Sequence, residues 1–343
     1  MSASKKPEGK PRQARPEVGL DALLAGLRAA GEESRLRILA LLREGELAVK
    51  ELTDILGQSQ PRVSRHLKLL VEAGLVRRFK EGSWAFFRVA EAGAGAAMAR
   101  AILALVDADD PLLVRDRARL DETRRRRAEA ATAYFRVHAR EWDALRSLYV
   151  DESEVEAAML QALGPQPIRS LLDLGTGTGR ILQLFAPRIS RGLGLDVSHE
   201  MLNLARAALD SPPFRHIQVR HGDIYDPPAD PGGYDVIVVH QVLHYLADPA
   251  RAVREAARTL APGGRLLIVD FAPHDLEFLR DEHAHRRLGF GPDEVRRWIE
   301  SAGLRPRPPL HLKPAEGGKL TVTLWVGLRE SAEEQDRVQE VAA

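Results

Sequence analysis

A loop of three alternating glycines constrains the fold of this 343-residue chain more than any other feature. Gly175, Gly177 and Gly179 follow the apolar segment 168–174, which has the pattern of a buried strand, and a helix is expected to begin at Arg180. Glycines let the backbone approach a ligand closely, and a helix N-terminus presents free N–H groups to it. A dinucleotide-binding loop, G-x-G-x-x-G, needs a glycine where Arg180 stands, and a P-loop needs G-K-[ST], which is absent. The loop therefore predicts a ligand site of another class between a strand and a helix.

Apolar strands alternate with helices through the C-terminal half of the chain. This alternation predicts a parallel sheet covered by helices on both faces. Two further strands, 310–312 and 320–327, are separated only by a glycine-containing loop, so they should pair antiparallel. We therefore expect an α/β, Rossmann-like domain over residues 146–329 that ends in an antiparallel strand pair. A nicotinamide-binding Rossmann domain is the alternative, although such sheets are mostly parallel. The other expected strands are 168–174, 193–196, 217–221, 236–239 and 266–271.

The N-terminal half has a different pattern, in which short helices precede two strands. This order predicts a winged helix-turn-helix domain of the α+β class over residues 18–92. Residues 93–145 are expected to form a helical linker and cap that takes part in dimerisation, with the four arginines 124–127 as a solvated helix face. Residues 1–17 are predicted to be a disordered basic arm and residues 330–343 a charged tail. The expected helices are 20–29, 34–42, 50–56 and 60–73, and the hairpin strands are 76–79 and 85–89.

Charge and composition exclude several function classes. The formal net charge is +1, so affinity for a nucleic acid must come from a local patch. The chain has no cysteine, which excludes disulfides, thiolate metal sites and cysteine nucleophiles. No apolar run approaches the ~20 residues that span a bilayer. We expect a cytoplasmic protein with no membrane segment and no metal site.

A basic patch occurs between residues 59 and 80. Ser59 is expected to cap the helix 60–73, and Arg62, Arg65 and His66 lie opposite its apolar face. Such a patch predicts contact with DNA, and a winged helix used only for protein contacts is the alternative. Against the single acid Glu72, the six cations of the patch are Arg62, Arg65, Lys68, Arg77, Arg78 and Lys80.

The motifs between residues 168 and 270 occur in the order found in class I S-adenosylmethionine-dependent methyltransferases. The segment Asp173-Leu-Gly-Thr-Gly-Thr-Gly179 resembles the first motif of that family, D-x-G-x-G-x-G. The resemblance implies that Asp196 accepts hydrogen bonds from both ribose hydroxyls of the cofactor, that Met201 packs on the adenine, and that Asp223 accepts from the adenine amino group. The implied cofactor-binding residues are Asp173, Gly175, Thr176, Gly177, Gly179, Asp196, Val197, Met201, Asp223, Ile224 and His240.

The acceptor of the methyl group is expected to be a small molecule. Residues 131–145 resemble the cap of small-molecule methyltransferases related to quinone-biosynthesis enzymes, and Tyr134 within them could reach the cofactor carboxylate. An enzyme that methylates DNA amino groups would carry [DNS]-P-P-[YFW] where His240-Gln-Val-Leu stands. Because methyl transfer is an in-line displacement, the protein supplies alignment and sometimes a base. The candidate catalytic residues are His240, His244 and Tyr134; His283 and His285 are either further bases or residues of a polar helix.

The segment 36–89 resembles the ArsR/SmtB winged-helix repressors. The resemblance rests on Ser59-Gln-Pro, Ser64-Arg-His-Leu and Ala73-Gly-Leu-Val76. It implies a double-stranded DNA operator and a homodimer formed through helices near 20–30 and 93–106. Where many members have E-L-C-V-C-[DE]-L, this chain has Glu46-Leu-Ala-Val-Lys-Glu-Leu52, so thiolate-based sensing and arsenite methylation are excluded. The implied DNA-binding residues are Ser59, Gln60, Arg62, Ser64, Arg65, His66 and, in the wing, Lys80.

Three functions are compatible with this pair of domains. The first is a DNA-binding regulator fused to a methyltransferase that acts on a small molecule. The second is a pure regulator whose methyltransferase fold senses S-adenosylmethionine or S-adenosylhomocysteine, because such a sensor needs the same cofactor motifs. The third is a methyltransferase whose winged helix serves only for dimerisation.

Overall fold

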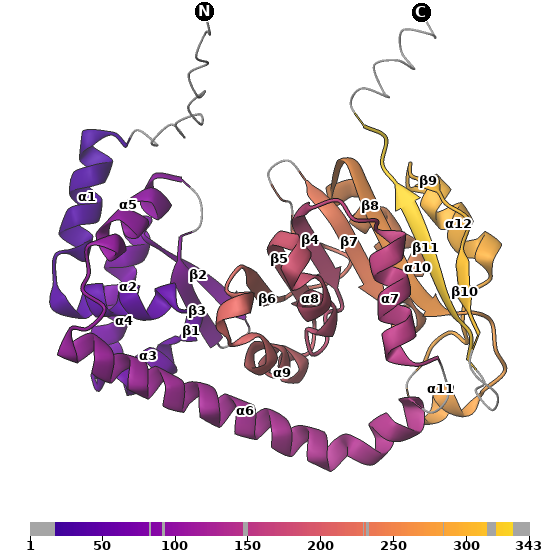
Figure 1. Ribbon diagram of the computed structural model, residues 1–343, viewed down its shortest axis with the longest axis horizontal. Coiled ribbons are helices and arrows are strands. Elements are labelled where there is room, and N and C mark those ends of the chain that lie inside the picture. Colours follow the sequence, from indigo (N-terminus) through magenta and orange to yellow (C-terminus); the bar gives the residue numbers. More distant parts are fainter. Residues whose placement is uncertain are drawn as a thin grey trace, which may run out of the picture. The chain divides into compact units, whose positions relative to one another are not determined.

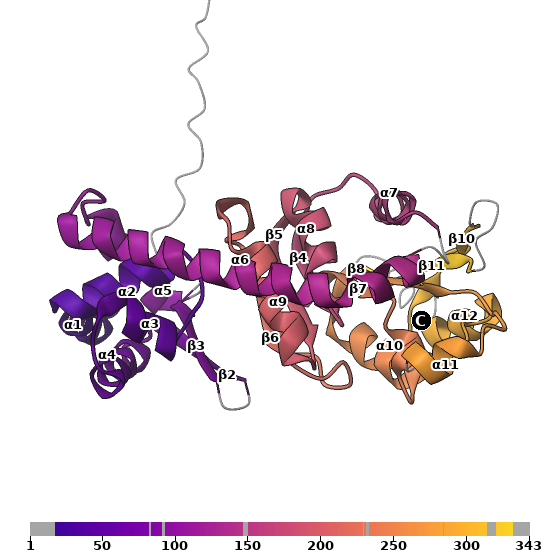
Figure 2. The same cartoon turned by 90° about the horizontal axis from the view of Figure 1, so that it is seen from below.

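The computed structural model describes residues 18–81, 84–90, 93–146, 150–228, 230, 233–283, 285–313 and 320–331. Within these ranges, the side chains of residues 80, 81, 84, 128, 130–146 and 282 are not described. The chain forms two compact units that divide between Glu122 and Thr123 (Figure 1). The division falls inside α6 (Pro111–Arg146), which is one continuous helix (Figure 2). The predicted order, an α+β domain followed by an α/β domain, is confirmed.

The first unit is a winged helix-turn-helix. Four helices precede a β-hairpin, and a short strand that the sequence pattern did not predict pairs antiparallel with the second hairpin strand. Two residues are too few to show strand periodicity. The helices are α1 (Leu20–Ala30), α2 (Glu33–Arg43), α3 (Val49–Leu56), α4 (Gln60–Glu72) and α5 (Gly93–Ala104), and the strands are β1 (Leu47–Ala48), β2 (Val76–Glu81) and β3 (Trp84–Val89).

The core of this unit extends past the predicted domain boundary at residue 92. Met98 and Leu103 of α5, together with Leu120 of α6, pack into the same apolar cluster as the buried residues of α2, α3 and α4. Burying the apolar side of α5 in that cluster removes it from water, which stabilises the unit. The predicted linker of residues 93–145 is therefore shared between the two units.

The helix ends of the first unit are closed by local hydrogen bonds. Glu51 in α3 accepts a hydrogen bond from the backbone N–H of Ala48 at 2.8 Å, and Gly57, which follows the last residue of α3, has the left-handed conformation. Ser59 occupies the position before α4, but its side chain accepts no hydrogen bond from that helix, so the predicted side-chain cap is wrong. Pro61 lies in the first turn of α4, where a missing N–H is harmless.

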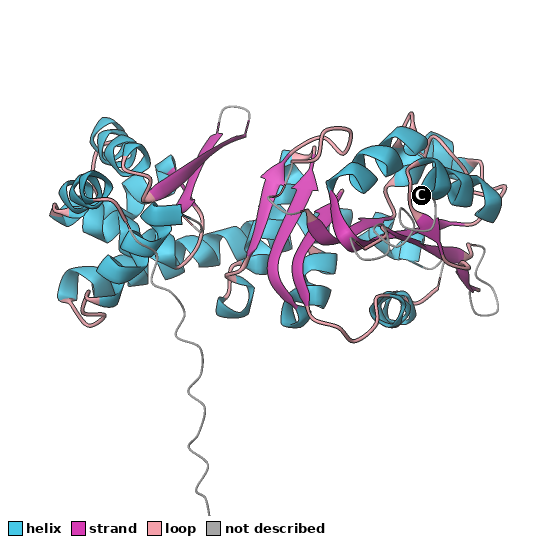
Figure 3. Cartoon of the chain, turned by 90° about the horizontal axis from the view of Figure 1, so that it is seen from above, coloured by secondary structure: helices cyan, strands magenta, loops and turns pink. Residues whose placement is uncertain are grey.

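The second unit contains a sheet, whose strands are shown as magenta arrows in Figure 3. Its strand order among the described residues is β10-β11-β8-β7-β4-β5-β6, with β9 paired to β11. Strands β4 to β8 run parallel, and β10 and β11 pair antiparallel, as predicted. β11 also pairs antiparallel with β8. The strands are β4 (Ile168–Leu174), β5 (Ile189–Asp196), β6 (Ile217–His221), β7 (Tyr234–His240), β8 (Leu260–Phe271), β9 (Arg305–Pro306), β10 (Leu310–Leu312) and β11 (Val322–Leu328).

Helices cover both faces of this sheet because successive strand residues point to opposite sides. Leu171 packs with α7, α8 and α9 on one face, and Leu172 packs with α10 and α12 on the other. None of the helices in the described ranges combines the length and the apolar character that a bilayer span requires. The helices are α7 (Glu152–Ala162), α8 (Arg180–Phe185), α9 (His199–Leu209), α10 (Pro249–Thr259), α11 (Phe278–His283) and α12 (Pro292–Ser301).

Candidate functional site

The glycine loop leaves the carboxyl end of β4 in a conformation that side chains rarely adopt. Gly175, Gly177 and Gly179 have φ angles of +75°, +52° and +80°. The N–H groups of Gly175 and Thr176 both donate to the carbonyl oxygen of Leu195 at 2.8 Å, which fastens the loop to β5. A Cβ atom at Gly175 would lie 2.3 Å from Cγ2 of Val242, so only glycine fits there. A Cβ atom at Gly177 would have no atom within 4 Å, so the middle of the loop is open.

Asp196, at the end of β5, is held by backbone donors on both sides. Its Oδ2 accepts from the N–H of Gly177 and its Oδ1 from the N–H of Ser198, each at 2.8 Å. A carboxylate oxygen has two lone pairs, so each oxygen can accept a further hydrogen bond. The carboxylate is therefore oriented in advance and retains the capacity to bind a vicinal diol.

Asp173 is buried beneath the glycine loop with one oxygen satisfied. The hydroxyl of Thr176 donates to its Oδ2 at 2.6 Å, and its Oδ1 has no hydrogen-bond partner among the described residues. Burial, and to a smaller extent the negative charge of Asp196, raises the pKa of Asp173 to about 7. The unpartnered buried oxygen can accept a hydrogen bond from a donor or cation placed next to the loop.

The remaining predicted cofactor residues follow β5 and β6 at the same edge of the sheet. Ser198 caps α9 by accepting from the N–H of Met201 at 3.2 Å, which fixes the start of that helix beside Asp196. Asp223 accepts from the N–H of Tyr225 at 2.9 Å in a tight turn, and the following Ile224 is buried. Val197 is exposed. The carboxyl ends of three adjacent parallel strands therefore bring together all the predicted cofactor residues except His240.

His240 ends β7, the strand that neighbours β4 on its other side. Burial lowers the pKa of His240 to about 4, although the negative charges of Asp270 and Glu156 oppose this shift. The next residue, Gln241, has a φ of +53° and is the one non-glycine residue with positive φ in the described part of the chain. Strained backbone of this kind often occurs at binding sites, and nothing in the sequence indicated it.

His244 lies in the core of the second unit. Its Nδ1 lies 2.8 Å from Oδ1 of the fully buried Asp270, so Nδ1–H donates to that carboxylate. The ring of His285 lies against it, with centroids 4.1 Å apart, and Nε2 of His244 is buried without a partner among the described residues. Sequence reasoning missed Asp270, although an acid inside the apolar run 266–271 was a usable signal.

His285 is not on a polar helix, because α11 ends at His283 and the side chain of His285 is buried. Burial and the neighbouring His244 lower the pKa of His285 to about 4. Within the described ranges, no group of three or more histidine, aspartate or glutamate side chains is placed to hold a metal ion.

A bidentate ion pair attaches α7 to the glycine loop. Arg180, the first residue of α8, donates through Nη2 to Oε2 of Glu156 at 2.7 Å and through Nε to Oε1. The negative charge of Glu156 also acts to raise the pKa of His240, which ends β7. The sequence pattern did not predict this pair, because its two residues lie in different helices, 24 positions apart.

The outer surface of α4 carries most of the predicted DNA-binding residues. Their side chains are exposed with the exception of His66, which is 12% exposed and has its Nδ1 3.5 Å from Oε2 of Glu32. The contact with Glu32 places this imidazole at the start of α2 rather than outward, and burial lowers the pKa of His66. The side chains of Lys80 and Tyr134 lie outside the described residues. The exposed residues are Ser59, Gln60, Arg62, Ser64 and Arg65.

Comparison with known families assigns both units. Residues 32–78 match the family described as "Bacterial regulatory protein, arsR family", and residues 172–268 match the family described as "Methyltransferase domain". The chain therefore carries an arsR-family helix-turn-helix and a methyltransferase domain. The second match sets aside the nicotinamide-binding alternative for the α/β unit.

Known relatives match only part of the chain. It is 40% identical over 116 residues to an uncharacterized 37.1 kDa protein in transposon Tn4556 of Streptomyces fradiae, covering 33% of each chain. It is 29% identical over 125 residues to the uncharacterized methyltransferase YcgJ of Bacillus subtilis, covering 36% of this chain and 49% of the relative. The crystal structure of YcgJ matches 53% of this chain and 100% of that one, with a TM-score of 0.45 and 18% identity. The chain thus spans a third to a half of the length of these two curated relatives.

Proposed function

We propose that this protein is a DNA-binding regulator of the ArsR type joined to an S-adenosylmethionine-dependent methyltransferase that acts on a small molecule. One observation carries the methyltransferase half: the carboxylate of Asp196 is fixed by the amide of Gly177 and faces an open glycine loop. The regulatory half rests on the exposed arginines of α4 within an arsR-family segment.

The residues at this edge of the sheet fit S-adenosylmethionine. In the proposed arrangement, Asp196 binds the ribose hydroxyls and Asp223 the adenine amino group, with Val197, Met201 and the amide of Ile224 around the ring. The unpartnered Oδ1 of Asp173 faces the positive charge of the methionine part. When bound, the cofactor supplies a methyl group activated by its sulfonium.

The chain's own residues then align the acceptor and remove its proton. His240 is neutral above pH 5 because its pKa is about 4, so its imidazole has a free lone pair for an acceptor O–H or N–H. His244, held by Asp270 in the core, acts as a positioning residue for the segment after β7. Tyr134 is proposed to reach the cofactor carboxylate.

Calorimetric titration with S-adenosylhomocysteine tests the cofactor site. Asp196→Asn replaces one acceptor oxygen by a donor, so we expect at least a tenfold loss of affinity, about 1.4 kcal/mol. Asp226→Asn is the control, since this exposed carboxylate lies in the turn after β6 and is not one of the predicted cofactor residues. Equal affinity in the wild-type protein and Asp196→Asn would contradict the placement of the ribose.

The alternative is a pure regulator that uses the methyltransferase fold as a sensor. One observation favours it: the candidate base His244 is buried in the core with Asp270, where a base that acts on a bound acceptor would have to be accessible. A gel-shift assay on DNA upstream of the gene, with each form of the cofactor, separates the functions. A sensor shows cofactor-dependent affinity for DNA without methyl transfer to any low-molecular-weight fraction of cell extract. A methyltransferase that uses its winged helix only for dimerisation shows no DNA affinity.

We also propose a homodimer. Leu20, Leu23, Leu24 and Leu27 of α1 are 38–70% exposed, so one side of this helix is apolar and uncovered in the single chain. Exposed apolar side chains that gather on one side of a helix are typical of a surface that pairs with a protein partner. α1 packs against α5, so both helices predicted to dimerise lie at one place in the first unit.

A further inference from the structure

The arginine run of residues 124–127 is not the uniform solvated face that its charge predicts. Arg124 donates through Nε to Oδ1 of Asp210 at 2.9 Å, and Arg127 donates through Nη1 to Oδ2 of the same carboxylate at 3.1 Å. The side chains of Arg124 and Arg127 are only 22% and 18% exposed, and that of Asp210 is 14% exposed. Arg125, which lies between them in sequence, is 67% exposed and pairs with Glu129 on the same helix. One side of α6 is therefore attached to Asp210.

Asp210 stands at the C-terminal end of α9. A carboxylate there faces the negative end of the helix dipole, which is unfavourable unless cations compensate it. The two guanidinium groups of α6 provide that compensation at the end of α9. The attachment thus involves the same helix that begins beside Asp196.

The glycine loop also packs along α9. A Cβ atom at Gly179 would lie 3.1 Å from Cδ1 of Leu209 and 3.3 Å from Cβ of Ala205, so the loop touches the last turns of the helix. A ligand that immobilises the loop and the start of α9 therefore restricts the end of α9 as well. Asp210 follows Leu209 directly, so the same restriction reaches the contact with α6.

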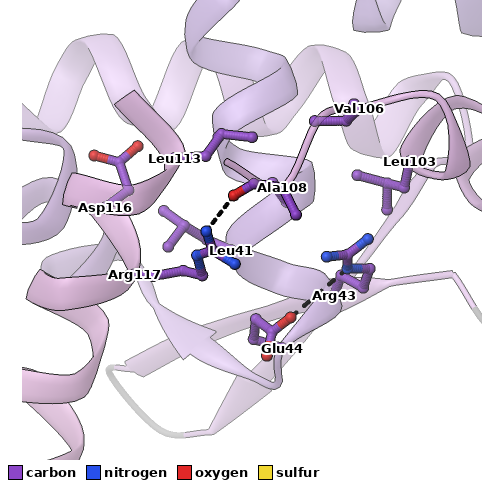
Figure 4. A pocket seen from close by; sticks show the side chains of 10 residues that line it. Leu41, Arg43, Glu44, Leu103, Val106, Ala108, Leu113, Asp116 and Arg117 are labelled. Atoms are coloured by element: carbon purple, nitrogen blue, oxygen red, sulfur yellow. Dashed lines mark hydrogen bonds and ion pairs between the residues drawn. The ribbon is translucent and has the colours of Figure 1, made fainter. Parts of the chain in front are cut away.

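The first turns of α6 are also held by charged side chains, here within the winged-helix unit. Asp116 accepts from Arg37 of α2 at 2.7 and 2.9 Å, and both side chains are buried. Asp116 also borders a small pocket lined by α2, α5 and α6 (Figure 4). Arg119 donates to the carbonyl oxygen of Ile55 at 2.8 Å, in the last turn of α3 before the turn that leads to α4. Charged contacts thus hold α6 in each of the two units.

We propose that α6 couples cofactor occupancy to the winged helix and that Asp210, with Arg124 and Arg127, is the contact through which it does so. This inference rests on the proposed function, because it requires a cofactor at the glycine loop. Binding that orders the loop and α9 strengthens the contact with α6 and stabilises that helix. Coupling between two sites is reciprocal. Removing the contact should therefore lower the cofactor affinity by the same factor by which bound cofactor stabilises α6 through that contact.

Hydrogen–deuterium exchange of the full-length protein, with and without S-adenosylhomocysteine, tests the coupling. In the wild-type protein, the amides of residues 116–127 should exchange at least about fivefold more slowly when the ligand is bound than when it is absent. Asp210→Asn should abolish this protection while calorimetry shows that the ligand still binds, with affinity lowered by the same factor. Arg125→Gln is the matched control and should keep the full protection.

The double variant Arg124→Gln/Arg127→Gln removes the other side of the contact and should behave as Asp210→Asn does. If one of the two variants fails to fold, the other still tests the proposal. Unchanged exchange in wild-type α6 when calorimetry shows bound ligand overturns the coupling and leaves the proposed cofactor site intact. Full protection in Asp210→Asn or in the double variant also overturns it. Absence of any binding to the wild-type protein overturns the cofactor site itself and the coupling with it.

Discussion

Asp173 shows how a single residue can favour binding over stability. Its pKa of about 7 lies above the value of about 3.9 for an unfolded chain, so the folded state binds more protons between these two pH values. Its contribution therefore stabilises the fold at low pH and is lost as the pH rises from about 4 through 7. A cation in the site would offset the buried charge, which gives a physical reason for an acid at this position.

Asp173→Asn should accordingly raise stability at pH 8 and weaken cofactor binding. The gain in unfolding free energy should be on the order of 4 kcal/mol at pH 8 and close to zero at pH 4, because the pKa differs by about 3 units and one unit corresponds to about 1.4 kcal/mol. Thermal unfolding across this range measures the gain, with exposed Asp226→Asn as the control. A gain that does not change with pH would contradict the buried ionisation.

Gly175 is restricted both by its backbone and by its neighbour Val242. An alanine would adopt an unfavourable left-handed conformation, at about 1–2 kcal/mol, and would overlap the valine as well. Gly175→Ala should lower the unfolding free energy by at least that amount and abolish binding of S-adenosylhomocysteine in calorimetry. Gly291→Ala is the control: no atom lies within 4 Å of its Cβ position and its φ is negative, so it should cost no more than the roughly 1 kcal/mol of an alanine at the N-cap of α12 and should leave binding intact.

At the scale of elements, α4 combines a buried face with an exposed basic one. Val63, Leu67 and Leu70 attach it to the core, which leaves Arg62 and Arg65 free to contact phosphate. Arg62→Ala/Arg65→Ala should lower DNA affinity and reduce the slope of log K against log salt by about 0.9 for each phosphate that the variant no longer neutralises.

Fluorescence anisotropy with a labelled duplex at several salt concentrations measures both quantities. Lys68→Ala, on the same helix but paired with Glu72 at 3.8 Å, is the matched control and should have the smaller effect. Equal slopes for the wild-type protein and the double variant would favour a winged helix that serves only protein contacts.

At the scale of the whole molecule, the exposed leucines of α1 predict self-association. Leu20→Lys/Leu27→Lys places two charges in the apolar stripe, and it should shift the protein from dimer to monomer in sedimentation velocity because burying an unpaired charge is unfavourable. Leu310→Lys, at an exposed leucine of the methyltransferase unit, is the control. A wild-type protein that sediments as a monomer at micromolar concentration would contradict the dimer.

Local patterns alone determined much of this protein. Glycine spacing and strand periodicity predicted β4 and β6 at their observed bounds, the antiparallel pair of β10 and β11, and the order of the helices in the winged-helix unit. These features depend on residues within a few positions of each other, where chain geometry dictates the pattern. The candidate cofactor residues after β4, β5 and β6 came from the resemblance to class I methyltransferases, and they lie together because adjacent parallel strands end at one edge of the sheet.

Only the tertiary structure decided which distant side chains meet. Asp270 pairs with His244 26 residues away, and Arg124 and Arg127 reach Asp210 more than 80 residues along the chain. His66 lies on the polar side of its helix by sequence, yet packing against Glu32 covers it. Such pairs form because buried or half-buried polar groups must find partners once the core is assembled, and no local pattern encodes that partner. The glycine loop was evident in the sequence, but its attachment to α9, and of α9 to α6, emerged only from the folded chain.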